Sequence, residues 1–86
     1  MKNLYRSKIN ITIRKTILDP QGKAVEHSLK SHGFDSVIDT RIGKYIELMI
    51  DTGSKEEAEK ISMEACRRLL ANPVMEDFVI ETEEVN

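Results

Sequence analysis

Isoleucine residues at every second position near the start of the chain constrain its fold most. Ile9, Ile11 and Ile13 alternate with polar residues in the segment 8–14. A period of two is typical of a β-strand that buries one face. The segment 46–51 repeats this alternation. The sequence therefore predicts a sheet with one buried face and one polar face, which points to solvent or to a partner.

A helix is predicted after the first strand. Asp19 can accept hydrogen bonds from free backbone amides, and Pro20 has the backbone angle that suits the first helical position. Val25 and Leu29 belong to a modest apolar stripe. Gly33 is suited to the C-terminal cap of this helix.

A second helix is predicted from the capping-box pattern of residues 54–57, Ser-Lys-Glu-Glu, in which hydroxyl and carboxylate can bond each other's backbone amides. Its apolar stripe would be formed by Ala58, Ile61, Ala65, Cys66 and Leu69. Asn72-Pro73 would end it, and a short strand at residues 78–80 would lead into the acidic end of the chain.

Residues 37–50 favour extended structure, which we expect a tight turn at Gly43-Lys44 to divide into two strands. The predicted fold class is therefore α+β, a single ferredoxin-like βαββαβ domain over residues 1–86, with an antiparallel sheet and two helices on one face. The other face would stay bare. Because such faces and edges are readily buried by a second copy, we expect a homodimer or a higher homo-oligomer formed through sheet surface or edges.

The charges are segregated along the sequence. Residues 1–18 carry five cations and no acid, whereas residues 52–86 carry four cations and nine acids. In the predicted topology the first and last strands are antiparallel neighbours, so the basic segment would lie beside the acidic one and attract it. The segregation thus has a structural explanation.

No pattern for catalysis or ligand binding is found in the sequence. His27 and His32 lie near no patterned acid and nucleophile, and the scattered acids lack metal-ligand spacing. Cys66, the single cysteine, is expected to be a small helix residue. Glycine-rich phosphate loops are absent, and the central strands offer only Tyr45 for stacking on RNA bases. We therefore expect no catalytic residue, no bound cofactor or metal, and no nucleic-acid partner.

Membrane association is not expected either. No apolar run approaches the roughly 20 residues that a membrane helix needs, and the first residues lack the apolar stretch of a signal peptide. We expect a cytoplasmic protein.

Residues 18–25, continuing to Leu29 and Gly33-Phe34, resemble the first helix of the PurS family, the small subunits of the amidotransferase formylglycinamidine ribonucleotide synthase. Residues 41–48 are similar to its central strand motif, and residues 66–77 to the end of its second helix. Singly these motifs are weak, but three in register over nearly the whole chain are specific.

The resemblance implies a non-catalytic subunit of a ligase in purine biosynthesis. Such a complex amidates formylglycinamide ribonucleotide, using ATP and ammonia from glutamine. A large PurL-like synthetase subunit would bind ATP, Mg and substrate, a PurQ-like glutaminase subunit would release ammonia, and dimers of this chain would bridge the two. The candidate contact residues are Asp19, Pro20, Gln21, Arg41, Lys44 and Tyr45. The alternative is a regulatory domain of the ACT type, which shares the βαββαβ order and binds amino acids.

Overall fold

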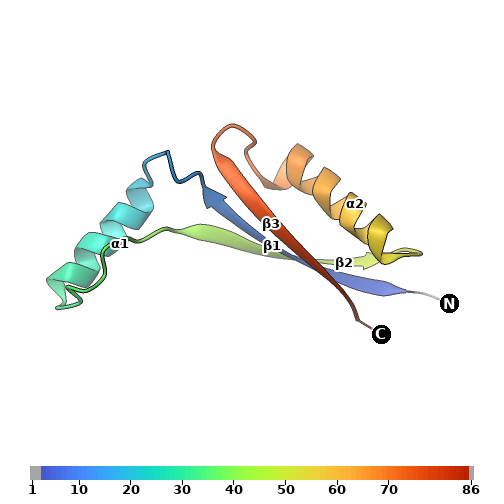
Figure 1. Cartoon of the computed structure of the whole chain (residues 1–86), viewed down its shortest axis with the longest axis horizontal. Helices are drawn as coiled ribbons and strands as arrows, with labels where there is room; N and C mark the ends of the chain where they lie inside the picture. The colour runs from blue at the N-terminus through green and yellow to red at the C-terminus, as the bar shows by residue number, and fades with distance from the viewer. Residues whose placement is uncertain (1–2, 86) are drawn as a thin grey trace.

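The computed structural model describes residues 3–85 and contains one three-stranded sheet and two α-helices (Figure 1). The elements in chain order are β1 (Leu4–Ile13), α1 (Pro20–Ser31), β2 (Gly43–Asp51), α2 (Lys55–Ala65), the short π-helical segment η1 (Cys66–Leu70) and β3 (Glu76–Glu84). The strand order is β2-β1-β3, and β1 runs antiparallel to both neighbours. The predicted α+β class and antiparallel sheet are confirmed.

The predicted fourth strand does not form. Residues 37–42 are irregular, and the expected turn at Gly43-Lys44 is wrong, because both residues already belong to β2 and pair with Thr12 and Ile11. The segment 34–42 returns from the far end of α1 toward the sheet (Figure 1). It lies beyond the sheet, where no strand is available to pair with it.

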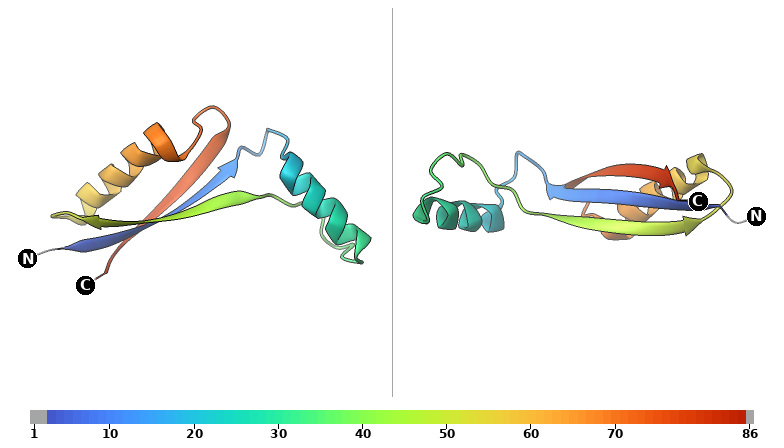
Figure 2. Two further views of the ribbon diagram at one scale, coloured as in Figure 1. Left: turned by 180° about the vertical axis from the view of Figure 1, so that it is seen from behind. Right: turned by 90° about the horizontal axis from the view of Figure 1, so that it is seen from below.

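Only α2 covers a face of the sheet, so the prediction that both helices lie on one face is wrong. α1 extends past the end of the sheet that is opposite the two termini, as the views in Figure 2 agree. We call α1 with the returning segment 34–42 the α1 arm. The Cα radius of gyration is 16.7 Å, against about 12 Å for a compact domain of this length. The single chain is therefore elongated and leaves much surface uncovered.

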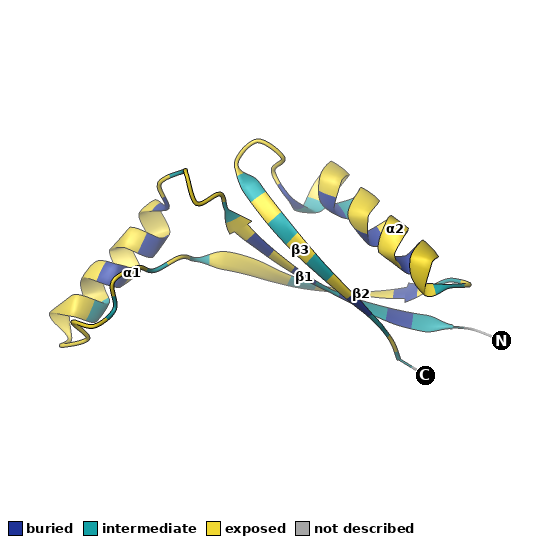
Figure 3. Cartoon of the chain, viewed as in Figure 1, coloured by how far each residue is buried: buried dark blue, intermediate teal, exposed yellow. Residues whose placement is uncertain are grey.

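The core lies between β1 and the C-terminal part of the α2–η1 segment (Figure 3). Ile9 and Ile11 of β1 are fully buried against Cys66 and Ala71, and a second buried group surrounds Ala58 nearer the start of α2. Cys66 is thus the small buried helix residue that its sequence context predicts, and burial raises the pKa of its thiol.

The π-helical turn changes which residues of the second helix face the core. The amide of Ala71 donates to the carbonyl of Cys66, five residues earlier, at 3.0 Å. Because this wider turn shifts the helical period, Leu70 packs on the core and Leu69 is 85% exposed. Ile61 is also exposed. The predicted placement of Leu69 and Ile61 in the buried stripe is therefore wrong.

A chain of hydroxyl groups crosses the buried interface between the sheet and α2. Ser62 donates to the carbonyl of Ala58 at 2.9 Å. Its hydroxyl must therefore accept from Ser7, and Ser7 in turn accepts from Thr82 at 3.0 Å. All three hydroxyl residues are buried, and each donor has a partner.

The predicted attraction between the first and last strands is confirmed. Glu83 of β3 lies 3.2 Å from both Arg6 and Lys8 of β1. Near the other end of the pair, Arg14 lies 3.3 Å from Asp77. Lys8, and then Arg6, hold the pKa of the Glu83 carboxyl below its usual range.

The predicted helix ends are also confirmed. Ser54 caps α2 by accepting from the amide of Glu57 at 3.2 Å. Gly33 follows α1 with a φ of 93°, a left-handed conformation that favours glycine. Asn72 accepts from the amide of Val74 just after the second helix.

We expect Ser7→Ala to destabilise the protein by about 1–3 kcal/mol, because it leaves the buried hydroxyl of Thr82 without an acceptor. Urea denaturation at neutral pH measures this change. Ser36→Ala, at an exposed position, is the matched control and should alter the free energy of unfolding by no more than about 0.5 kcal/mol. Equal effects of the two substitutions would show that the hydroxyl chain does not stabilise the core.

Candidate protein-binding site

The six candidate contact residues lie near the junction between the sheet and the α1 arm. Asp19 lies in the connection that enters the arm, and Arg41 lies in the connection that leaves it. The two connections meet where β1 ends and β2 begins (Figure 1). The structure thus brings together residues that are more than 20 positions apart in the sequence. All of them except Asp19 are exposed, but the guanidinium of Arg41 is bound to backbone carbonyls of this chain.

Asp19 joins the start of α1 to the start of β2. One carboxylate oxygen accepts from the amide of Gly22 at 3.0 Å, and the other accepts from the amide of Ile42 at 2.9 Å. The residue is buried. The hydrogen bond from Ile42, and then that from Gly22, hold the pKa of the Asp19 carboxyl below its usual range. The carboxylate therefore positions the α1 arm, in addition to the predicted helix cap.

The side chain of Arg41 binds the backbone of the connection between β1 and α1. Its guanidinium donates to the carbonyl oxygens of Lys15 at 2.8 Å, Ile17 at 3.1 Å and Arg14 at 3.4 Å. A planar group with five donors suits such a set of acceptors. The side chain thus orders residues 14–17 from the opposite connection, a role that its sequence context did not suggest.

Gly22 allows α1 and the returning segment to approach each other closely. A Cβ atom at this position would overlap the carbonyl oxygen of Thr40 and crowd the carboxylate of Asp19. Together with the two hydrogen bonds of Asp19, this contact fixes the base of the α1 arm.

The exposed candidates lie on two different surfaces. Pro20 and Gln21 begin α1. Lys44 lies on the α2 side of the sheet, with its ammonium 3.8 Å from Glu76. Tyr45 lies on the opposite side, and its hydroxyl donates to Glu47 at 2.8 Å. These side chains have room for contacts with another protein, and that role stays a prediction.

The sheet face opposite α2, which we call the open face, has no helix over it (Figure 1). It combines paired charges with exposed apolar side chains, and the residues that form it are Arg6, Lys8, Asn10, Thr12, Tyr45, Glu47, Met49, Asp77, Val79, Glu81 and Glu83. Met49 is 54% exposed and Val79 68% exposed. Its polar part was predicted from the alternation in β1 and in residues 46–51, but Val79 was not singled out in the sequence.

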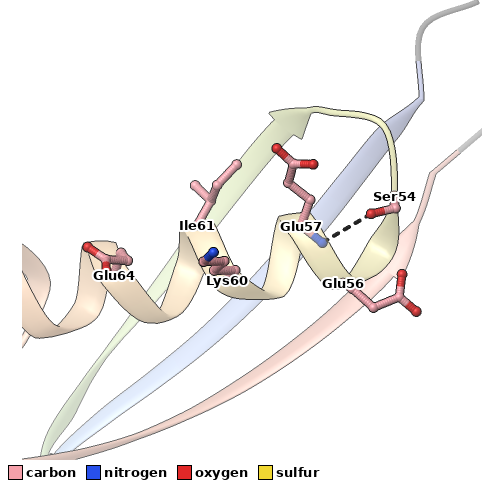
Figure 4. Close-up of a pocket in the computed structure, with 6 residues that line it drawn as sticks. All are labelled: Ser54, Glu56, Glu57, Lys60, Ile61 and Glu64. Carbon is pink, nitrogen blue, oxygen red and sulfur yellow. Dashed lines mark hydrogen bonds between the residues drawn. The ribbon is translucent and has the colours of Figure 1, made fainter.

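A shallow groove on α2 does not gather catalytic groups. It is lined by Ser54, Glu56, Glu57, Lys60, Ile61 and Glu64, whose side chains diverge from the helix (Figure 4). Within residues 3–85, no three His, Cys, Asp or Glu side chains are arranged to hold a metal ion. In the same range, no helix is long and apolar enough to cross a bilayer.

Comparison with known proteins gives one consistent family. Residues 6–84 match the family PurS, described as phosphoribosylformylglycinamidine (FGAM) synthase. The PurS subunit of this synthase from Bacillus subtilis is 44% identical over 82 residues, which cover 95% of this chain and 96% of the relative.

Two solved structures agree in fold over nearly the whole chain. B. subtilis PurS superposes with a TM-score of 0.82 at 43% identity, covering 92% of this chain and 98% of the other. A chain in the structure of PurLQS from Thermotoga maritima gives a TM-score of 0.83 at 34% identity, covering 95% and 98%. The three-stranded α+β fold therefore matches solved PurS structures.

We expect Gly22→Ala to destabilise the protein, although alanine is preferred to glycine in helices by about 1 kcal/mol. The new methyl group would push the helix away from the carbonyl of Thr40, at a cost of about 1–3 kcal/mol. Thermal unfolding monitored by circular dichroism measures the net effect. At Gly53 a Cβ would meet no atom within 4 Å, so Gly53→Ala is the matched control. A rise in melting temperature for Gly22→Ala would contradict the close approach.

Acid should weaken the base of the α1 arm through Asp19. Because the folded-state pKa of this carboxyl is lowered, its contribution to stability is complete above its unfolded pKa of about 3.9. The contribution is lost as the pH falls through the folded-state pKa. In urea denaturation between about pH 7 and pH 2, Asp19→Asn should lose less stability on acidification than the unmodified chain does. Asp35→Asn, at an exposed position, should keep the unmodified dependence, and identical profiles for all three proteins would contradict the role of Asp19.

Proposed function

Because the chain belongs to the PurS family of phosphoribosylformylglycinamidine (FGAM) synthase subunits, we propose that it is a non-catalytic structural subunit bridging a glutaminase subunit and a synthetase subunit. One observation carries the proposal. A chain in the solved complex PurLQS matches this chain along 95% of its length. The family match also favours this function over an ACT-type regulatory domain.

The complex would carry out the ATP- and glutamine-dependent amidation of formylglycinamide ribonucleotide in purine biosynthesis, in the cytoplasm. ATP and Mg would be used by the synthetase subunit, and this chain would bind no cofactor. The role of this chain would be to hold two active sites at a fixed separation. Free ammonia is protonated and diluted in water, so a closed transfer path between the sites is needed. Binding energy from a bridging subunit would maintain that closure.

The bridging unit would be a homodimer. The radius of gyration of 16.7 Å, the open face and the α1 arm leave the single chain with much surface that another protein can cover. A second copy of the chain would cover one part of this surface, and the two large subunits would cover other parts. The candidates Pro20, Gln21, Lys44 and Tyr45, which are exposed, would contact the two large subunits.

Reconstitution with the two large subunits tests the proposal. We expect glutamine-dependent formation of the amidine to require this chain, whereas turnover supported by added ammonia should continue without it, because only the transfer path is lost. Undiminished glutamine-dependent turnover by the two large subunits alone would overturn the proposal.

The exposed candidates can be tested in the same system. The double variant Lys44→Ala, Tyr45→Ala should raise the Kd for the large subunits by at least about tenfold, as loss of an interface anchor does. The weaker binding should appear as reduced co-elution. Arg68→Ala is the control, because Arg68 is exposed on η1 and pairs only with Glu64 in the described part of the chain. Unchanged co-elution and turnover of the double variant would remove both residues from the interface.

A further inference from the structure

The α1 arm contains two buried side-chain atoms that have no hydrogen-bond partner among the residues that the structure describes. They are Oε1 of Glu26, in α1, and Oγ1 of Thr40, in the returning segment 34–42. Buried polar groups in folded proteins are nearly always paired, so each exception needs an explanation, and a bound water or ion is a common one. A charged acceptor is especially unfavourable when it is buried without a partner. The two atoms therefore point to a small ligand in the arm.

Glu26 and Thr40 belong to one interface. α1 lies beyond the sheet and away from α2, as Figures 1 and 2 agree, so the returning segment covers its inner side. A Cβ atom at Gly22 of α1 would overlap the carbonyl oxygen of Thr40. Glu26 follows Gly22 by four residues, which places it on the same side of the helix, one turn further along. These two residues are the buried ones of α1.

The two carboxylate oxygens of Glu26 have different surroundings. The side chain is 10% exposed, and its Oε2 atom lies 3.7 Å from the ammonium of Lys23 and 3.5 Å from that of Lys30. Oε1 is the oxygen without a partner. The two lysines thus neutralise the carboxylate through one oxygen and leave the other for a ligand.

The ligand has to donate to a carboxylate and bond a hydroxyl group. A cation is disfavoured, because Lys23 and Lys30 already bring two positive charges to the same carboxylate. An anion would be repelled by Glu26, and an apolar molecule would leave both atoms unpaired. Water meets both requirements, because it can donate to the carboxylate and accept from the hydroxyl of Thr40.

We propose that one water molecule is bound between α1 and the returning segment, where it donates to Oε1 of Glu26 and accepts from the hydroxyl of Thr40. The site belongs to the single chain and does not depend on the proposed function. Asp19 and Arg41 fix the base of the α1 arm. Glu26 lies seven residues beyond Asp19, about 10 Å further along the helix, so the water ties the arm well away from its base.

The substitution Thr40→Val tests the water through the sign of its effect, because it removes the hydroxyl and keeps the shape of the side chain. With the water bound, the folding equilibrium constant from urea denaturation at neutral pH should fall about threefold to tenfold. In a dry interface the same substitution would remove an unpaired hydroxyl and raise the constant. Thr12→Val, at an exposed position on the open face, is the matched control and should change the constant by no more than about twofold. A rise or an unchanged constant for Thr40→Val overturns the proposal.

Substitutions of Glu26 show whether both residues hold the same molecule. Glu26→Leu removes the acceptor, so Thr40→Val should have no more than about a twofold effect in that background. Glu26→Gln loses the charge but keeps an oxygen that accepts, so Thr40→Val should still lower the constant about threefold to tenfold. A full effect beside Glu26→Leu, or none beside Glu26→Gln, overturns the shared water. If Glu26→Leu does not fold, the Glu26→Gln background still decides.

A high-resolution crystal structure of the unmodified chain identifies the ligand directly. We expect one peak of water density within about 3.2 Å of both Oε1 of Glu26 and Oγ1 of Thr40, and we expect the Thr40→Val structure to lose it. A direct hydrogen bond between the two side chains, a cation on the carboxylate, a side chain of a second copy at that position, or no density there overturns the proposal.

Discussion

The rest of the structure depends on β1, because it is the strand that pairs on both sides. Its apolar residues Ile9 and Ile11 are fully buried, and its cations Arg6 and Lys8 lie beside Glu83 of β3. β2 and β3 do not pair with each other. α2 closes only one side of this three-stranded layer. A sheet so small leaves little room for a substrate cleft, whereas its edges, open face and projecting helix give it a large surface for contacts with other chains.

Local patterns in the sequence predicted the elements whose causes are local. The alternation of Ile9, Ile11 and Ile13, the cap at Asp19 and the hydroxyl cap at Ser54 each act within a few residues, and the structure has them as predicted. The position of α1 and the missing fourth strand could not be predicted in this way. They depend on contacts between segments more than 20 residues apart, such as the hydrogen bond from Ile42 to Asp19.

In the candidate site, too, local features were predicted and long-range contacts were not. The sequence singled out Asp19 and Arg41 through resemblance to a family, yet it gave no signal that both side chains bind backbone groups across the junction. Three of the residues that carry the resemblance, Asp19, Gly22 and Arg41, fix the base of the α1 arm. The orientation of this arm is therefore linked to the motif by which the family is identified. The sequence pattern also could not predict that Leu70 instead of Leu69 packs on the core. Such patterns assume a constant helical period, and the π-helical turn alters it.

The α1 arm acts mechanically as a lever. A helix of 12 residues is about 18 Å long, so a tilt of about 10° at its base displaces its tip by about 3 Å. A displacement of that size equals the length of a hydrogen bond. Small changes in the few polar contacts of Asp19 and Arg41 are thus magnified at the far end of the helix, and those contacts set how accurately a surface there can be presented.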